Sequence, residues 1–111
     1  MSKKPNIAHA IYKEHLPRFQ HQFPHLFNKD APVPLMVGIR DRLVKRGFNP
    51  VTVDCVLRCW TSRIEYRRRL TMGGARYNLK GVRSGSVTIK QREYAKELVE
   101  KFEQSKLNRG F

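Results

Sequence analysis

A large excess of positive charge most constrains what this chain can fold into. Twenty-three lysine and arginine residues face nine acidic ones among 111 residues, which leaves a net charge of +14 and a sequence pI of about 10.5. Such a surplus of like charge in so small a domain repels itself, and it attracts polyanions. Hydrophobic residues make up 40% of the chain, enough for one domain and too few for a second core.

The positive charge is concentrated in the middle of the chain. Residues 40–84 contain twelve basic and three acidic side chains, a net charge of +9. Such a segment is typical of proteins that bind polyanions, with nucleic acid as the first partner to consider and acidic membrane surfaces as the second. We therefore expect the binding surface within residues 40–84.

The sequence lacks the marks of a membrane or metal-binding protein. No segment approaches the roughly 18 consecutive apolar residues that span a bilayer, and residues 1–5 do not resemble a signal peptide. Cys55 and Cys59 lie four residues apart in one expected helix, which fits two free thiols in a reducing compartment. Two cysteines also supply too few ligands for zinc. We expect a cytoplasmic protein with no metal, no cofactor and no membrane partner.

Proline and glycine positions divide most of the chain into helices. A proline inside a helix costs about 3 kcal/mol, so Pro17 should separate a first helix ending at His15 from a second one. Local start and stop signals predict the later helices. They run from Pro34 to the stop at Gly47, from Asn49 to about Leu70, and from about Thr88 onward.

The glycines after Leu70 indicate a β-hairpin. Two adjacent glycines interrupt the preceding helix, and short strands are expected at Ala75–Leu79 and Ser86–Ile89, joined by a turn at Gly81–Gly85. The sequence Thr-Ile-Lys-Gln at residues 88–91 matches a capping box for the last helix. The predicted fold class is α+β, a mainly helical single domain with a small β-hairpin.

The helix that follows Asn49 has two faces without charge. Its apolar residues recur at helical spacing and mark a core face, which consists of Val53, Val56, Leu57, Trp60 and Ile64. Tyr66 falls on nearly the opposite side, together with the two cysteines. The helix is therefore either sandwiched inside the domain or presents its second face to a ligand. We expect Trp60 to be buried and, in the second case, Tyr66 to be available to a ligand.

Basic residues gather around Tyr66 and in the expected hairpin. The members of this group are Arg58, Arg67, Arg68, Arg69, Arg76, Lys80 and Arg83. A solvated basic face is the alternative explanation, but nearly all of them are arginines, whose planar guanidinium matches phosphate oxygens and stacks on bases. We interpret Tyr66 and this group as a candidate nucleic-acid-binding surface.

The start of the helix after Phe48 is a second candidate for binding an anion. Asn49, Pro50, Val51 and Thr52 form this start, where backbone N–H groups and the positive end of the helix dipole suit a phosphate or a terminal hydroxyl. The alternative is that Asn49 only caps its own helix.

The sequence favours a binding protein over an enzyme. Four histidines crowd the first quarter with only Glu14 and Asp30 nearby, and no catalytic triad, carboxylate pair or phosphate-binding glycine loop is visible. We expect no small-molecule substrate.

One alternative function is a helix-turn-helix DNA-binding regulator, because residues 39–60 are expected to form two helices around a turn at Gly47. Its second helix would place Val51, Val53 and Asp54 where base-reading or phosphate-binding side chains are needed. A further alternative is an RNA-binding component of a larger assembly, which would have little affinity for isolated hairpins.

Five short motifs occur in order along the chain. They are Phe23-Pro24-x-x-Phe27, Pro34-Leu35-x-x-Gly38-Ile39, Tyr66, Gly74-Ala75-Arg76-x-x-Leu79-x-Gly81 and Val87-Thr88. Their order and spacing resemble the ProQ/FinO domain, a bacterial RNA-binding domain, over residues 12–103. The resemblance implies helices with a small hairpin and a concave side that binds RNA.

The resemblance also implies a function and site residues. Members of the family are RNA chaperones that bind small regulatory RNAs and messenger 3′ ends, and they recognise a terminator hairpin with its single-stranded uridine tail. By this resemblance Tyr66 and Arg76 contact RNA, residues 49–52 receive the 3′-terminal nucleotides, and the hairpin lies near the duplex stem. Met36 departs from the family, since many relatives have a basic residue there, and residues 67–69 are candidates to supply the missing charge.

These observations predict one RNA-binding domain at residues 12–107, a flexible extension at 1–11 and a short tail at 108–111. The expected function is binding of structured RNA 3′ ends and assistance of RNA–RNA pairing in post-transcriptional regulation.

Overall fold

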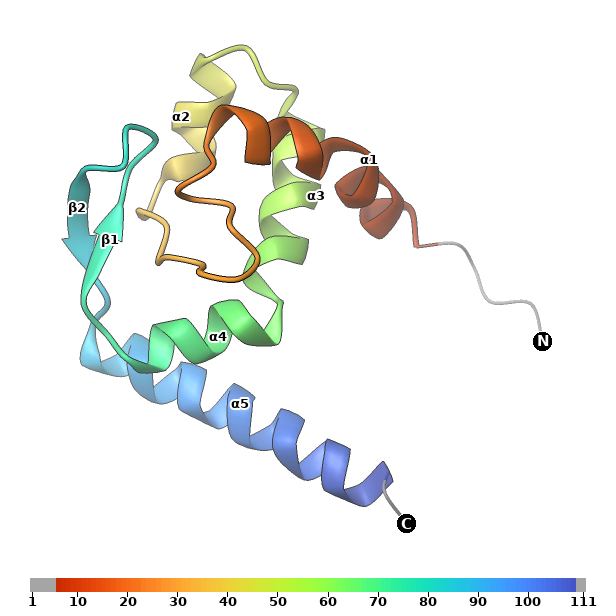
Figure 1. The fold of residues 1–111 in the computed structure, drawn as a ribbon, viewed down its shortest axis with the longest axis vertical. Helices are drawn as coiled ribbons and strands as arrows, with labels where there is room; N and C mark the ends of the chain where they lie inside the picture. Colours follow the sequence, from red (N-terminus) through yellow and green to blue (C-terminus); the bar gives the residue numbers. More distant parts are fainter. Residues whose placement is uncertain (1–5, 110–111) are drawn as a thin grey trace.

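The computed structural model describes residues 6–109, which form five helices and one two-stranded hairpin (Figure 1). In chain order the elements are α1 (Ile7–Gln22), α2 (Ile39–Lys45), α3 (Pro50–Thr61), α4 (Ile64–Thr71), β1 (Ala75–Tyr77), β2 (Arg83–Ser86) and α5 (Ile89–Arg109). The predicted α+β fold with a small hairpin is confirmed. Residues 1–5 of the expected extension and 110–111 of the expected tail lie outside the described residues, whereas residues 7–11 are helical. Within the described range, no helix is both long and apolar enough to cross a membrane.

The helices pack in pairs around an aromatic core. α1 and α2 pack against α3, and α5 packs along α4, while the hairpin lies beside α2 on the other side of the molecule from α1 (Figure 1). Trp60 is completely buried, with its ring centroid 5.3 Å from that of Phe27. Phe19 and Phe48 extend this aromatic cluster at a centroid distance of 4.8 Å. The predicted burial of Trp60 is therefore confirmed.

The helix break expected at Pro17 is wrong, because α1 continues through this residue. Tyr12, Leu16 and Phe19 lie on one buried face that spans the proline. Each of these large side chains contributes about 1.5–3 kcal/mol when buried, which offsets the roughly 3 kcal/mol that the proline costs.

The second expected helix begins later than its proline indicates. α2 starts at Ile39, after Gly38 with a φ of +88°, and not at Pro34. The residues before it are extended and pair with β1, because the Met36 N–H donates to the Tyr77 carbonyl and the Tyr77 N–H donates to the Pro34 carbonyl, each at 2.9 Å. A third, strand-like segment therefore leads into α2.

The long helix expected up to Leu70 is divided into α3 and α4. α3 ends at Thr61, after which the Arg63 N–H donates to the Trp60 carbonyl at 3.2 Å. The extended backbone of Arg63 then turns the chain before α4 begins. This turn changes the direction in which later side chains point. Tyr66 consequently lies in the core with 4% of its surface exposed, so the prediction that it faces outward is wrong.

The second strand of the hairpin lies earlier in the chain than expected, whereas α5 starts where its capping box predicts. β2 lies at Arg83–Ser86 and not at Ser86–Ile89, and it pairs antiparallel with β1 through a register shift. The capping box is confirmed: the Thr88 N–H donates to Gln91 Oε1 at 2.9 Å, and the Gln91 N–H donates to Thr88 Oγ1 at 3.1 Å.

Tyr66 and Arg76 hold the peptide groups of Leu35. The Leu35 N–H donates to the Tyr66 hydroxyl at 3.1 Å, and Arg76 Nη1 donates to the Leu35 carbonyl at 2.7 Å. Arg76 Nη2 also donates to Gln91 Oε1 at 3.0 Å. Leu35 is thereby tied to α4, β1 and the first turn of α5.

We expect Tyr66→Phe to lower the free energy of unfolding by about 1–3 kcal/mol, because it leaves the buried N–H of Leu35 without a partner. Trp60→Ala should lower it by about 3–5 kcal/mol through the cavity that it creates. Urea unfolding followed by circular dichroism measures both. Tyr94→Phe, at an exposed tyrosine, is the matched control. A Tyr66→Phe protein as stable as this control would contradict the role assigned to the hydroxyl.

Candidate nucleic-acid interface

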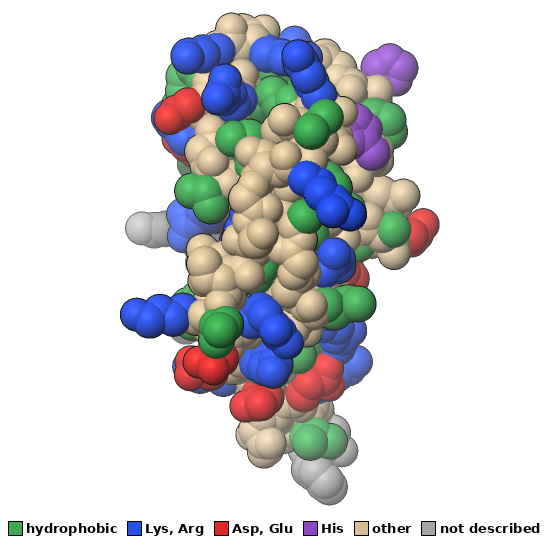
Figure 2. All heavy atoms as spheres, turned by 90° about the vertical axis from the view of Figure 1, so that its left-hand side faces the viewer, with side chains coloured by type: hydrophobic (Ala, Val, Ile, Leu, Met, Phe, Trp, Pro, Cys, Tyr) green, Lys and Arg blue, Asp and Glu red, His purple; other side chains and the backbone are tan. Residues whose placement is uncertain are grey.

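A basic hollow opens between α2 and the hairpin, and we name it the α2–hairpin hollow. It has a volume of about 390 Å³ and is lined by Met36, Arg42, Lys45, Arg46, Asn78, Leu79, Lys80 and Ser84. Figure 2 shows the side of the molecule that carries the hairpin, where Lys and Arg side chains gather at the upper end and recur along the face. Several acidic side chains lie toward its lower end.

Helical spacing brings three cations to one wall of this hollow. Arg42, Lys45 and Arg46 follow one another at i, i+3 and i+4, positions that share a helix face. They also lie at the carboxyl end of α2, where the helix dipole favours positive charge. The Arg46 guanidinium lies 5.7 Å from the centroid of the Phe23 ring, which holds it beside the core.

The turn of the hairpin forms the opposite wall. Asn78 Oδ1 accepts hydrogen bonds from the N–H groups of Lys80 and Val82, each at 3.0 Å. Leu79 is buried in the core, and Gly81 adopts a φ of +75° that favours glycine. The backbone is therefore fixed on both sides of Lys80, whose side chain is exposed.

The cations of the α2–hairpin hollow have no acidic partners. None of the four forms an ion pair with a carboxylate among residues 6–109. Like charges gathered at one place repel one another, and an anion with several charges relieves this repulsion. The hollow therefore suits a ligand that carries consecutive phosphates.

Tyr66 and Arg76 lie behind this surface. Both are buried, with 4% and 8% of their surfaces exposed, and both bind the backbone of Leu35, which precedes Met36 in the hollow wall. Tyr66 and Arg76 hold the backbone next to Met36 in place and so position this wall of the hollow. Their direct contact with RNA stays a prediction.

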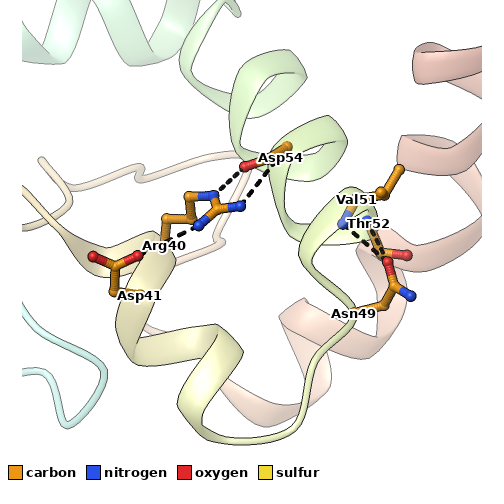
Figure 3. Close-up of polar contacts among 6 residues, drawn as sticks. All are labelled: Arg40, Asp41, Asn49, Val51, Thr52 and Asp54. Carbon is orange, nitrogen blue, oxygen red and sulfur yellow. Dashed lines mark hydrogen bonds and ion pairs between the residues drawn. The ribbon is translucent and has the colours of Figure 1, made fainter.

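The first turn of α3 is capped by its own side chain. Asn49 Oδ1 accepts hydrogen bonds from the N–H groups of Val51 at 2.9 Å and Thr52 at 3.2 Å (Figure 3). Pro50 has no N–H group to offer. The prediction that Asn49 caps this helix is confirmed. The N–H groups of Val51 and Thr52 are occupied by this cap, and binding of an RNA end at residues 49–52 stays a prediction.

An ion pair covers the same turn of α3. Arg40 Nε donates to Asp54 Oδ1 at 2.5 Å, and Arg40 Nη2 donates to Asp54 Oδ2 at 3.3 Å (Figure 3). The hydrogen bonds from Arg40 lower the pKa of the Asp54 carboxyl, and those to Asp54 raise the pKa of Arg40. The negative charge of Asp54, which would repel a phosphate, is therefore balanced by Arg40 of α2.

The arginine run after Tyr66 does not form one surface. Arg67 is half-buried, Arg68 forms an ion pair with Glu103 of α5, and Arg69 Nη1 donates to the Gly73 carbonyl at 2.9 Å. Arg68 therefore links α4 to α5 and has part of its charge balanced by Glu103, whereas Arg69 holds the end of α4 and keeps its charge.

Arg58 lines a second hollow, which we name the α1–α3 hollow. It has a volume of about 590 Å³ and is lined by Asn6, Ala8, His9, Tyr12, Lys13, Lys29, Arg58, Cys59, Ser62 and Arg63. Arg83 is exposed at the start of β2. Of the residues predicted to bind RNA, only Lys80 lines the α2–hairpin hollow.

The sequence contained one signal that would have found the missing residues. Arg42, Lys45 and Arg46 belong to the basic middle of the chain and lie on one face of α2. Their helical spacing, with Leu43 buried and Val44 partly buried between them, indicates an exposed basic stripe on an amphipathic helix.

We expect Asn49→Ala to lower the free energy of unfolding by about 1 kcal/mol, because two N–H groups lose their acceptor. Asn49→Asp keeps an acceptor at the same place and should remain close to the original stability. Thermal or urea unfolding of the two variants side by side measures the difference. If both variants lost the same stability, the hydrogen bonds accepted by the Asn49 side chain would not be what stabilises the start of α3.

Comparison with known proteins agrees with this architecture. The solved structure of NMB1681 from Neisseria meningitidis, described as a FinO-like RNA chaperone, superimposes with a TM-score of 0.68 at 19% sequence identity. The similarity covers 94% of this chain and 86% of that chain. No curated protein matches the sequence. The profile of the ProQ/FINO family matches residues 10–110, nearly the whole length, and the chain therefore belongs to the ProQ/FinO family.

Proposed function

We propose that this protein binds RNA and acts as an RNA chaperone. The observation that carries the proposal is the α2–hairpin hollow, where four cations that form no ion pair within residues 6–109 surround an open space of about 390 Å³. Membership of the ProQ/FinO family and the fold shared with an RNA chaperone support it.

The shape of the surface favours RNA over duplex DNA. Arg42 and Arg46 give the hollow guanidinium planes beside the partly exposed Met36, and unstacked bases of RNA loops and ends stack on such planes. In a helix-turn-helix regulator, α3 would enter the major groove and read base edges. Its exposed residues include Val51 and Asp54, and Asp54 is bound by Arg40, so this alternative is disfavoured.

We further propose that the protein holds the 3′ end of the RNA, as in a terminator hairpin with a uridine tail, and assists its pairing. The tail would pass through the α2–hairpin hollow toward the first turn of α3. The positive end of the α3 dipole there favours an anion. The side-chain nitrogen of Asn49, Nδ2, has no hydrogen-bond partner among the described residues and can donate to the RNA. The duplex stem would lie along the hairpin, near Lys80 and Arg83.

The affinity for RNA should depend strongly on salt. About six phosphate contacts give a slope of about −3 to −6 in log affinity against log salt concentration. The triple variant Arg42→Gln/Lys45→Gln/Lys80→Gln should bind on the order of tenfold more weakly, with a slope shallower by about 2–3. Fluorescence anisotropy across a salt series measures both quantities.

A matched control removes the same charge elsewhere. The variant Lys90→Gln/Lys96→Gln/Lys101→Gln changes three exposed lysines of α5 and has the same net charge as the triple variant of the hollow. It should lose much less affinity than the triple variant of the hollow. Equal losses in the two variants would mean that net charge, and not this hollow, determines binding.

The end of the RNA should also matter. We expect a hairpin with a uridine tail and a free 3′ end to compete about tenfold or more better than three other molecules. These are the same hairpin without the tail, the tailed hairpin with a 3′-phosphate, and duplex DNA. A difference of this size corresponds to about one or two lost hydrogen bonds at a buried partner. Competition against one labelled tailed hairpin measures the order, and equal competition by all four would refute end recognition.

A further inference from the structure

The α1–α3 hollow is separate from the α2–hairpin hollow. The two hollows share no lining residue, and one is built from α1 and the end of α3 while the other is built from α2 and the hairpin. In Figure 1 these two groups of elements lie on different sides of the molecule. An RNA strand bound in the α2–hairpin hollow would therefore leave the α1–α3 hollow open to another strand.

The charge of the α1–α3 hollow resembles that of the first. Lys13, Lys29 and Arg58 are exposed and form no ion pair within residues 6–109. Arg63 binds Glu65 at 2.8 Å through Nη2, while its Nη1 is buried without a hydrogen-bond partner among the described residues. The α1–α3 hollow is therefore surrounded by four cations, of which only Arg63 has a carboxylate partner within residues 6–109.

Aromatic and hydroxyl groups complete the hollow. Tyr12 lines the hollow with 8% of its surface exposed, and its hydroxyl makes no hydrogen bond to any described residue. Burial raises the pKa of this hydroxyl, and a phenol is in any case neutral and able to donate a hydrogen bond at neutral pH. The exposed ring of His9 lies 5.8 Å from the Tyr12 ring, which offers an unstacked base a flat surface beside the cations.

We infer that the α1–α3 hollow binds a second, single-stranded segment of RNA, with Lys13, Lys29 and Arg58 on its phosphates and His9 against a base. This inference rests on the proposed function and extends it. A chaperone with two such sites holds two RNA strands on one domain, which raises the effective concentration of each for the other.

The test asks whether one protein molecule binds two RNAs at once. The protein is saturated with an unlabelled tailed hairpin, and a labelled single strand of about ten nucleotides, not complementary to the hairpin, is titrated in. We expect the strand to bind without displacing the hairpin. The variant Lys13→Gln/Lys29→Gln/Arg58→Gln should bind the strand at least about tenfold more weakly while its affinity for the hairpin changes less than about threefold.

The Lys90→Gln/Lys96→Gln/Lys101→Gln variant serves again as the control of equal charge, and circular dichroism checks that each variant is folded. Three results would overturn the inference while leaving the proposed function intact. They are displacement of the hairpin by the strand, equal strand affinity in the variant and the original protein, and equal loss of both RNAs in the variant. Failure of the original protein to bind the hairpin would instead refute the proposed function and the inference with it.

Discussion

The structure depends on how the backbone of one residue, Leu35, is held. Its N–H and carbonyl groups are bound from opposite directions by Tyr66 of α4 and Arg76 of β1, and Arg76 reaches on to Gln91 of α5. A buried peptide needs such partners, because leaving either group unpaired costs about 1–3 kcal/mol. The segment so held leads directly into α2. The position of the α2 cations relative to the hairpin therefore follows from contacts in the core.

Local signals predicted most of the helix boundaries, because the physics that sets them is local. Asn49 caps α3, and Thr88 and Gln91 form the capping box of α5, as their spacing indicates. The errors arise where distant contacts outweigh local preference. Pro17 remains inside α1 because burial of one helix face offsets its cost, and Pro34 lies in an extended segment because β1 supplies its partner.

The candidate site was harder to predict than the fold for a related reason. Arg67, Arg68 and Arg69 are adjacent in sequence, yet the turn at Arg63 and the packing of α5 direct them to different partners. The cations that share one surface come from α2 and from Lys80, far apart along the chain. Their proximity depends on the Leu35 contacts, which no spacing within the sequence reveals. Composition correctly placed the charge in residues 40–84 but could not divide it between surfaces.

The fixed backbone around Lys80 has a consequence for the energetics of recognition. Buried Leu79 on one side and the Asn78-bonded turn on the other hold this backbone in place before any ligand arrives. Association loses conformational entropy for every group that it orders, and each mobile side chain costs about 0.5–1.5 kcal/mol. At Lys80 only the side-chain rotamers have to be ordered, since the loop is already preorganised. The ammonium group of Lys80 can therefore move on its flexible side chain while the backbone of the hairpin turn stays fixed. It can bind phosphates at differing positions without a change in the protein backbone.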